Sequence, residues 1–200
     1  MNAPKTRYSN CATAMHTAVL VIDVQQGLCE GEGAAFDCDA TIFRINLVTR
    51  KARAAGALVI FIQHESTTAY LEHGSHAWQL AKGLEVDPTD ARIRKTTPDA
   101  FLRTELEGVL RSHGVHNVIV CGMHSEFCVD TTTRRALALG FPVVLVADGH
   151  TSSGNAAISA HQVIAHHNAT LTNISSFGPR VQAVTAENVN IAACGSVASR

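Results

Sequence analysis

The sequence lacks the features that mark membrane, secreted and nucleic-acid-binding proteins. No apolar run approaches the roughly 18 to 20 residues that a membrane span needs, and residues 1–17 contain no continuous apolar segment typical of a secretory signal. Lys and Arg number 16 against 17 Asp and Glu, so the broad basic surface of a nucleic-acid or lipid binder is missing. We therefore expect a cytoplasmic protein with no nucleic-acid or membrane partner.

Cysteine is scarce, and its spacing shows no pairing pattern. Six cysteines in 200 residues are far fewer than a disulfide scaffold contains, and no C-x-x-C pair occurs among them. The 11 histidines form no H-E-x-x-H motif, and the cysteine spacings do not suggest a zinc site. We expect reduced thiols, no metal and no other cofactor. Each cysteine is then either a small buried residue or a reactive thiol.

The length and composition indicate one domain. A chain of 200 residues with 46% hydrophobic side chains can bury one substantial core. No repeat, low-complexity tract or linker interrupts it. We divide the chain into a flexible N-terminal arm at 1–17, a single domain at 18–191 and a C-terminal tail at 192–200.

Short apolar runs rich in β-branched residues alternate with helical patterns along the chain. Nearly continuous runs of this kind are typical of parallel strands that are covered on both faces. The pattern predicts an α/β fold, with a parallel sheet inside a three-layer α/β/α sandwich. The clearest strands are expected at 18–24, 57–63, 117–121 and 142–147, weaker ones at 91–94 and 170–174, and helices at 41–55, 100–112, 129–139 and 156–167.

Polar side chains follow the ends of several predicted strands, where an open parallel sheet binds its ligand. Asp23 ends the first strand, His64 follows the second, and Lys95 ends the weak strand at 91–94. Cys128 follows the strand at 117–121 and stands where the next helix is expected to begin. Free backbone N–H groups and the helix dipole are expected to lower the pKa of a thiol there, which would make it a nucleophile.

Each of these residues has an ordinary alternative when it is taken alone. Cys128 reads equally well as a buried cysteine at a helix start, Asp23 as a loop cap and Lys95 as a solvated surface residue. Together they are more specific, because an acid, an ammonium and a thiol at successive strand ends supply a base, a cation and a nucleophile.

The residues around these three resemble a known family, the isochorismatase-like cysteine hydrolase superfamily. The similarity holds in order and spacing over roughly residues 18–174. It is carried by the segments Val21-Ile-Asp23-Val-Gln25, Arg94-Lys95-x5-Phe101-x2-Thr104-x-Leu106 and Gly122-x5-Cys128-Val129-x2-Thr132.

The resemblance implies a six-stranded parallel sheet between helices and a catalytic triad of Asp23, Lys95 and Cys128. It also implies a cis peptide bond between Met123 and His124, with the backbone N–H groups of His124 and Cys128 forming an oxyanion hole. Asp23 would accept the thiol proton, Lys95 would stabilise the thiolate, and the thiolate would attack an amide or carbamoyl carbonyl. A thioester intermediate and its hydrolysis would follow.

Two departures from the family's subgroups narrow this expectation. Nicotinamidases of the family carry an Asp-x-His and a further His that bind a metal, whereas this chain reads Gln63-His64-Glu65 after its second strand. That difference argues against a nicotinamidase and against a bound metal. Isochorismatases proper, which cleave a vinyl ether, typically lack the cysteine, so Cys128 favours hydrolysis of a C–N bond.

The substrate pocket is expected to include Gln25, His64, Trp78, Phe101 and Phe127. His64 and Trp78 fall in segments that line the cleft in similar proteins. The ordinary alternatives are a loop histidine bonded to backbone for His64, a core residue on a helix face for Trp78, and packing for the two phenylalanines.

Other functions stay open at this point. The same fold serves an ester or vinyl-ether hydrolase, or a non-catalytic protein that binds a small molecule. A nucleotide-binding flavodoxin-like module is disfavoured, because no G-x-G-x-x-G motif or P-loop follows a strand.

Similar proteins associate, so the resemblance implies a homo-oligomer, a dimer or a larger assembly. Residues 181–191 read as a short helix or an edge element, and 192–200 as a tail. Apolar side chains in this region either contact a second subunit or pack over the edge of the chain's own sheet. These side chains are Phe177, Val181, Val184, Val189, Ile191 and Val197.

Overall fold

The computed structural model describes residues 17–67 and 69–191. Thr17, which the sequence assigned to the N-terminal arm, is buried and begins the first strand. The rest of the predicted arm, 1–16, and the predicted tail, 192–200, lie outside the described residues. Within the described part of the chain, no helix combines the length and the apolar character that crossing a membrane requires.

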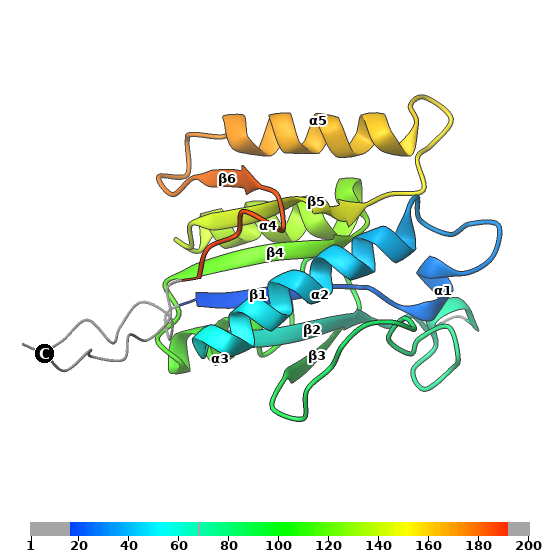
Figure 1. Cartoon of the computed structure of the whole chain (residues 1–200), viewed down its shortest axis with the longest axis horizontal. Coiled ribbons are helices and arrows are strands. Elements are labelled where there is room, and N and C mark those ends of the chain that lie inside the picture. Colours follow the sequence, from blue (N-terminus) through cyan, green and yellow to red (C-terminus); the bar gives the residue numbers. More distant parts are fainter. Residues whose placement is uncertain (1–16, 68, 192–200) are drawn as a thin grey trace, which may run out of the picture.

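Six parallel strands form one sheet in the order β3-β2-β1-β4-β5-β6 (Figure 1). The predicted α/β class and the six-stranded sheet are confirmed. β1 and β4 lie side by side, and the chain moves outward from them in opposite directions. Ligands of open α/β sheets bind at such a reversal, beyond the carboxyl ends of the two strands. The strands are β1 Thr17–Ile22, β2 Leu58–His64, β3 Ala91–Lys95, β4 Asn117–Met123, β5 Val143–Thr151 and β6 Val181–Val184.

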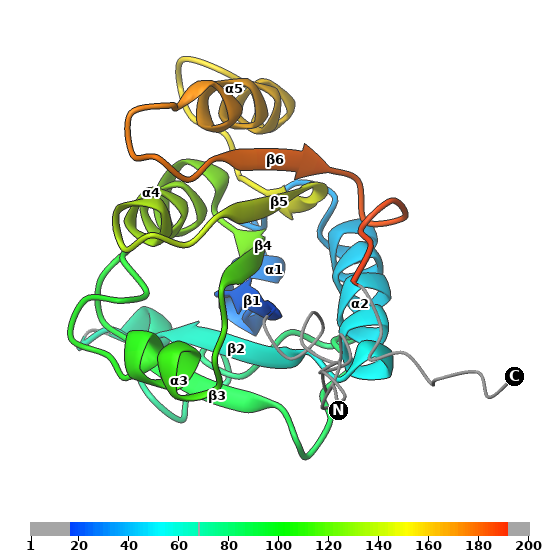
Figure 2. The same ribbon diagram turned by 90° about the vertical axis from the view of Figure 1, so that its left-hand side faces the viewer.

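Helices cover both faces of the sheet (Figure 2). In β1, Ala18, Leu20 and Ile22 join an apolar core shared with α3, α4 and α5, while Val19 and Val21 join a second core shared with α2. Every residue of β1 is therefore buried, which explains its unbroken apolar run. The helices are α1 Gln26–Cys29, α2 Cys38–Ala55, α3 Leu106–Ser112, α4 Asp130–Ala138 and α5 Ala160–Asn173.

Two predicted elements were wrong. The helix expected at 100–112 begins only at Leu106. Residues 170–174 are not a strand: 170–173 form the last turn of α5, where Leu171 is buried in the core. α5 begins after Ser159, whose hydroxyl accepts from the Gln162 backbone N–H in a capping box. The sixth strand is β6, in the region that the sequence left open between a short helix and an edge element.

The segment after β6 is held against α2. The ammonium of Lys51 donates to the carbonyl oxygens of Ala186 at 3.0 Å and Val189 at 3.1 Å, and also to that of Glu187. The Ala186 backbone N–H donates to the Asp148 carboxylate at 2.7 Å. These contacts fix the segment on the chain's own sheet.

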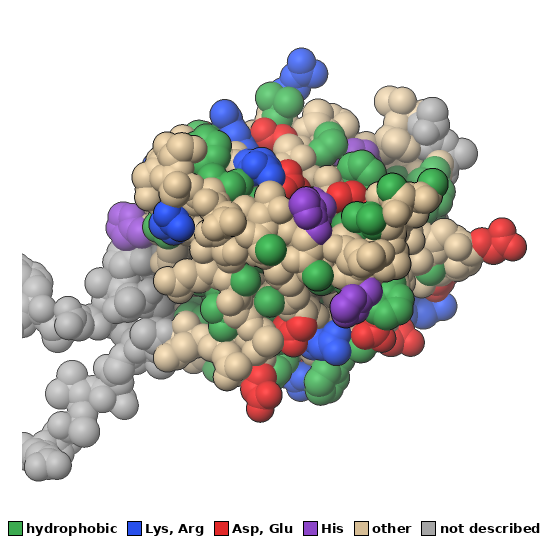
Figure 3. All heavy atoms as spheres, turned by 90° about the horizontal axis from the view of Figure 1, so that it is seen from above, with side chains coloured by type: hydrophobic (Ala, Val, Ile, Leu, Met, Phe, Trp, Pro, Cys, Tyr) green, Lys and Arg blue, Asp and Glu red, His purple; other side chains and the backbone are tan. Residues whose placement is uncertain are grey.

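Four of the six apolar side chains singled out near the C-terminus pack within the chain. Val181 and Val189 are buried, Val184 and Ile191 pack against the α2 core, and Val197 lies outside the described residues. Figure 3 shows the face over α5, where apolar side chains are interspersed with polar and charged ones. The intramolecular alternative therefore explains Val181, Val184, Val189 and Ile191, whereas Phe177 is 43% exposed. Oligomerisation stays a prediction that rests on the resemblance.

Candidate active site

Asp23 lies directly beyond the carboxyl end of β1. Its backbone N–H donates to the Ile62 carbonyl of β2 at 2.8 Å, and its side chain is buried. Its φ of 51° lies in the left-handed region, which a non-glycine residue rarely adopts. The turn places a carboxylate at the centre of the sheet's carboxyl edge, where β1 and β4 lie side by side.

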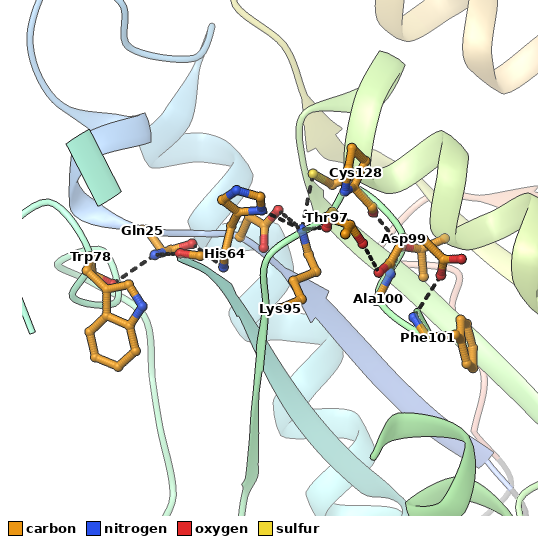
Figure 4. A network of polar contacts seen from close by, with 12 residues as sticks. Gln25, His64, Trp78, Lys95, Thr97, Asp99, Ala100, Phe101 and Cys128 are labelled. Carbon is orange, nitrogen blue, oxygen red and sulfur yellow. Dashed lines mark hydrogen bonds and ion pairs between the residues drawn. The ribbon is translucent and has the colours of Figure 1, made fainter. Parts of the chain in front are cut away.

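Lys95 ends β3, and its ammonium lies at the centre of a cluster of polar contacts (Figure 4). Nζ lies 2.6 Å from Asp23 Oδ2, 3.1 Å from the Thr97 carbonyl oxygen, 3.2 Å from Cys128 Sγ and 3.3 Å from His64 Nδ1. Burial by itself lowers the pKa of Lys95, but the Asp23 carboxylate and Cys128 outweigh burial and raise it above its ordinary value. The lysine therefore stays a cation although its side chain is fully buried.

The two oxygens of the Asp23 carboxylate face different surroundings. Oδ2 is paired with Lys95, whereas Oδ1 is buried and has no hydrogen-bond partner. Asp23, His64 and Cys128 each present a polar atom within 4.8 Å of the other two. A buried carboxylate oxygen with free acceptor capacity beside a thiol is suited to take the thiol proton.

Cys128 lies in η2, a π-helical turn over Ser125–Val129 that follows β4. The Met123–His124 peptide bond before this turn is cis, as the resemblance implied. The prediction of a lowered thiol pKa was wrong, although Cys128 does lie just before α4, which begins at Asp130. Burial and the Asp23 carboxylate raise the pKa of the Cys128 thiol to about 12, against the opposing effect of Lys95.

Gly122 of the motif is required by a close approach of β4 to β1. It pairs with Ile22 in the sheet, and its φ is 118°. A Cβ atom on Gly122 would lie 2.0 Å from the Ile22 carbonyl oxygen. Only glycine fits this position, which brings the turn that carries Cys128 against the strand end that carries Asp23.

His64 joins this cluster from the end of β2. Burial, followed by the nearby Lys95 ammonium, lowers the pKa of the His64 imidazole. Asp23, His64 and Cys128 together have the donor types of a metal site, but Lys95 Nζ contacts all three of them. An ammonium therefore occupies the centre of the only such group found in the described chain, and a metal would have to displace it.

Gln25 and Trp78 lie next to His64, as Figure 4 shows. The buried Gln25 amide donates to the carbonyl oxygens of His64 at 3.0 Å and Trp78 at 2.9 Å, and accepts from the His64 backbone N–H at 2.8 Å. These bonds give Gln25 a positioning role in place of the substrate contact we predicted. The indole Nε1 of Trp78 is buried without a hydrogen-bond partner, so it remains a candidate for substrate contact.

The two predicted pocket phenylalanines differ. Phe101 is buried in the core and stacks on Phe141 at a centroid distance of 6.3 Å, so packing explains it. Phe127 is 57% exposed on η2 and meets the His124 ring edge-on at 6.5 Å. Phe127 can therefore contact a bound molecule beside Cys128, while Phe101 supports the loop from within.

Two contributors to the site were missed at the sequence level. One is the Thr97 carbonyl that accepts from Lys95, and no residue type indicates a backbone ligand. The other is Thr132, whose hydroxyl accepts from the Ala100 backbone N–H at 3.2 Å and donates to the Pro98 carbonyl at 3.3 Å. Thr132 belongs to the motif, which therefore indicated the residue without its role of tying α4 to the loop after β3.

Comparison with known proteins agrees with this geometry. The model of the isochorismatase domain matches residues 17–176. The chain belongs to the isochorismatase family of hydrolases. Streptothricin hydrolase of Streptomyces noursei is 35% identical over 153 residues, covering 76% of this chain and 61% of that protein. Ureidoacrylate amidohydrolase RutB of Pantoea ananatis is 29% identical over 179 residues, covering 71% of this chain and 72% of that protein.

The isochorismatase fold extends over nearly the whole described chain. The crystal structure of an isochorismatase from Pseudomonas putida superposes with a TM-score of 0.80 at 26% identity, covering 92% of this chain and 95% of that one. This isochorismatase-family chain spans about half to three fifths of the length of the two streptothricin hydrolases that it matches. Within that shared domain, the structure brings Asp23, Lys95 and Cys128 together in one buried cluster.

Proposed function

We propose that this protein hydrolyses an amide or carbamoyl C–N bond of a small molecule, with Cys128 as the nucleophile. The observation that carries the proposal is the ammonium of Lys95, which bridges Asp23 Oδ2 and Cys128 Sγ while Asp23 Oδ1 stays unpaired. This arrangement supplies a proton acceptor and a cation next to the thiol. The names of the streptothricin hydrolase and the ureidoacrylate amidohydrolase support C–N chemistry.

The first half of the reaction forms a thioester. Asp23 Oδ1 accepts the thiol proton as Sγ of Cys128 bonds to the carbonyl carbon, so a thiol with a pKa of about 12 need not ionise beforehand. The backbone N–H groups of His124 and Cys128 hold the developing oxyanion. The C–N bond then breaks, and the leaving amine takes the proton from Asp23.

The second half regenerates the thiol. The Asp23 carboxylate accepts a proton from a water molecule whose oxygen bonds to the thioester carbon. The C–S bond breaks, the proton returns to Sγ of Cys128, and the carboxylic or carbamic acid leaves. Throughout, the positive charge of Lys95 stabilises negative charge on sulfur and keeps Asp23 in place.

No step requires a metal or another cofactor, and we propose that none takes part. We propose that His64 and Phe127, which lie near the nucleophile, and Trp78, which lies beyond His64, contact the substrate. We also propose a cytoplasmic location and a homo-oligomer, with no nucleic-acid or membrane partner. Light scattering at micromolar concentration tests the oligomer, because a mass near that of the 21.3 kDa chain would refute it.

A panel of small amides, ureas and carbamoyl compounds tests the proposed function. Wild type should release amine from at least one of them, and Cys128→Ala should release none. Cys121→Ala is the matched control, because Cys121 is buried within β4 and lies outside the cluster. A thioester trapped on Cys128 and detected by mass spectrometry would support the mechanism. Turnover by Cys128→Ala within tenfold of wild type would refute it.

A further inference from the structure

His150 is a buried titratable side chain that the proposed mechanism does not use. It lies near the end of β5 and exposes 1% of its surface. The register between β4 and β5 shifts between Val120 and Gly122, which places His150 opposite Gly122 instead of further along the sheet. The irregular pairing therefore brings an imidazole beside the strand end that leads into η2.

Both ring nitrogens of His150 are engaged by neighbouring elements. Nδ1 lies 2.7 Å from Oγ of Ser125, the first residue of η2, and Nε2 lies 3.0 Å from Oδ1 of Asn168 on α5. The Asn168 amide donates to the Ala147 carbonyl at 2.9 Å, which directs its oxygen toward the imidazole. The Ser125 hydroxyl is fully buried and lies 3.0 Å from the Thr151 carbonyl as well.

These contacts fix the tautomer of His150. Because Asn168 presents an oxygen, Nε2 of His150 must carry a hydrogen. Burial lowers the pKa of His150, although the Asn168 bond and the carboxylates of Asp148 and Glu126 oppose this and His167 adds to it. The ring is therefore neutral, and its bare Nδ1 and the Thr151 carbonyl oxygen share the one Ser125 hydroxyl proton as its two acceptors.

The pair lies directly behind the predicted oxyanion hole. Ser125 follows the cis peptide bond and precedes Cys128 by three residues in the same five-residue turn. The turn is closed by the His124 carbonyl, which accepts from the backbone N–H groups of Phe127 at 3.1 Å and Val129 at 3.2 Å. A shift of Ser125 would therefore rotate the backbone N–H groups of His124 and Cys128, which lie before and after it in the chain.

We propose that His150 and Ser125 form a positioning pair that anchors η2 to β5 and α5 and aims the backbone N–H groups of His124 and Cys128 at the substrate carbonyl oxygen. The pair touches no reacting atom, so both residues act through the turn. This inference rests on the proposed function, because it assigns the backbone N–H groups to an oxyanion.

Two probes separate the oxyanion hole from the thiol itself. Acylation of Cys128 by p-nitrophenyl acetate passes through an oxyanion, whereas alkylation by iodoacetamide displaces iodide at a saturated carbon and forms none. Release of p-nitrophenolate and the mass of the Cys128 peptide report the two rates. Ser125→Ala and His150→Leu remove the anchor from either side. His161→Leu is the matched control, since His161 is exposed on α5 and lines the cavity beside His150.

Both anchor variants should slow acylation by about 10- to 100-fold and leave alkylation of Cys128 within about threefold of wild type. His161→Leu should leave both rates unchanged. Equal losses of both rates would indicate general disorder of the site and overturn the proposal, and so would unchanged acylation in Ser125→Ala. If His150→Leu fails to fold, Ser125→Ala decides. If wild-type Cys128 is not acylated at all, the proposed function fails and this inference falls with it, whereas unchanged Ser125→Ala refutes the positioning pair alone.

Discussion

The ammonium of Lys95 lies 2.6 Å from Asp23 Oδ2, and neither side chain exposes more than 1% of its surface. This ion pair joins the ends of β3 and β1, which are separated in the sheet by β2. Because both charges are removed from water, each depends on the other, and the pair couples the stability of the fold to the chemistry of the site.

Lys95→Met should reduce both stability and activity. The change leaves the Asp23 carboxylate buried without its cation, which should lower the free energy of unfolding by about 3–5 kcal/mol. Urea denaturation measures this effect, and turnover should fall by at least about 100-fold because the thiolate loses its counter-charge. The double variant Asp23→Asn/Lys95→Met should recover most of the stability and none of the activity. A double variant as unstable as Lys95→Met would contradict the pairing argument.

Alkylation should reach Cys38 before Cys128 in the free enzyme at pH 8. A hydrogen bond from Cys29, with a smaller opposing effect of burial, lowers the pKa of Cys38, whereas burial raises that of Cys128 to about 12. Only the thiolate reacts, so at any pH below its pKa a thiol with a higher pKa has a smaller fraction in the reactive form. The Cys128 rate with iodoacetamide should therefore rise about tenfold per pH unit from 7 to 10, while the Cys38 rate levels off earlier. Peptide mass spectrometry follows both, and a Cys128 rate that is flat across this range would show an ionised resting thiol.

Exhaustive chelation should leave turnover unchanged. The reason is that the Lys95 ammonium already occupies the centre of the Asp23, His64 and Cys128 group. Activity before and after treatment with a strong chelator, with metal content measured in parallel, tests this. If the protein contains stoichiometric zinc or iron and its removal abolishes turnover, the reaction depends on a metal and this prediction is wrong.

Gly122→Ala should destabilise the protein by about 3 kcal/mol or more. The added Cβ would lie 2.0 Å from the Ile22 carbonyl oxygen, and neither strand can retreat without breaking the sheet. Gly140→Ala is the matched control, because Gly140 also has a positive φ, of 93°, but nothing lies within 4 Å of its Cβ position. Gly140→Ala should lower the free energy of unfolding by about 1 kcal/mol, because alanine tolerates a positive φ less well than glycine. Equal effects in thermal unfolding would show that the close approach of β4 to β1 is unimportant.

The local pattern of the sequence was sufficient for the fold class and for placing three candidate residues at one edge of the sheet. β-branched runs report strands buried on both faces, because each face of this sheet is covered by helices. Asp23, Lys95 and Cys128 were candidates because Lys95 ends a strand and the other two follow strand ends, and parallel strands end at one edge. Each of these signals is carried by a short segment of the chain, a strand and the few residues at its end, and can therefore be read from the sequence.

Properties that depend on distant neighbours were decided only by the tertiary structure. The pKa of Cys128 follows from burial and from Asp23, about a hundred residues earlier, so the local argument from a helix start predicted the wrong direction. Phe101 and Gln25 have side chains suited to a pocket, but Phe101 stacks on Phe141, and the Gln25 amide donates to the backbone carbonyls of His64 and Trp78. The apolar C-terminal residues 181–191 pack inside the chain because Lys51 of α2 binds three carbonyls there, a contact across more than 130 residues that no local pattern encodes.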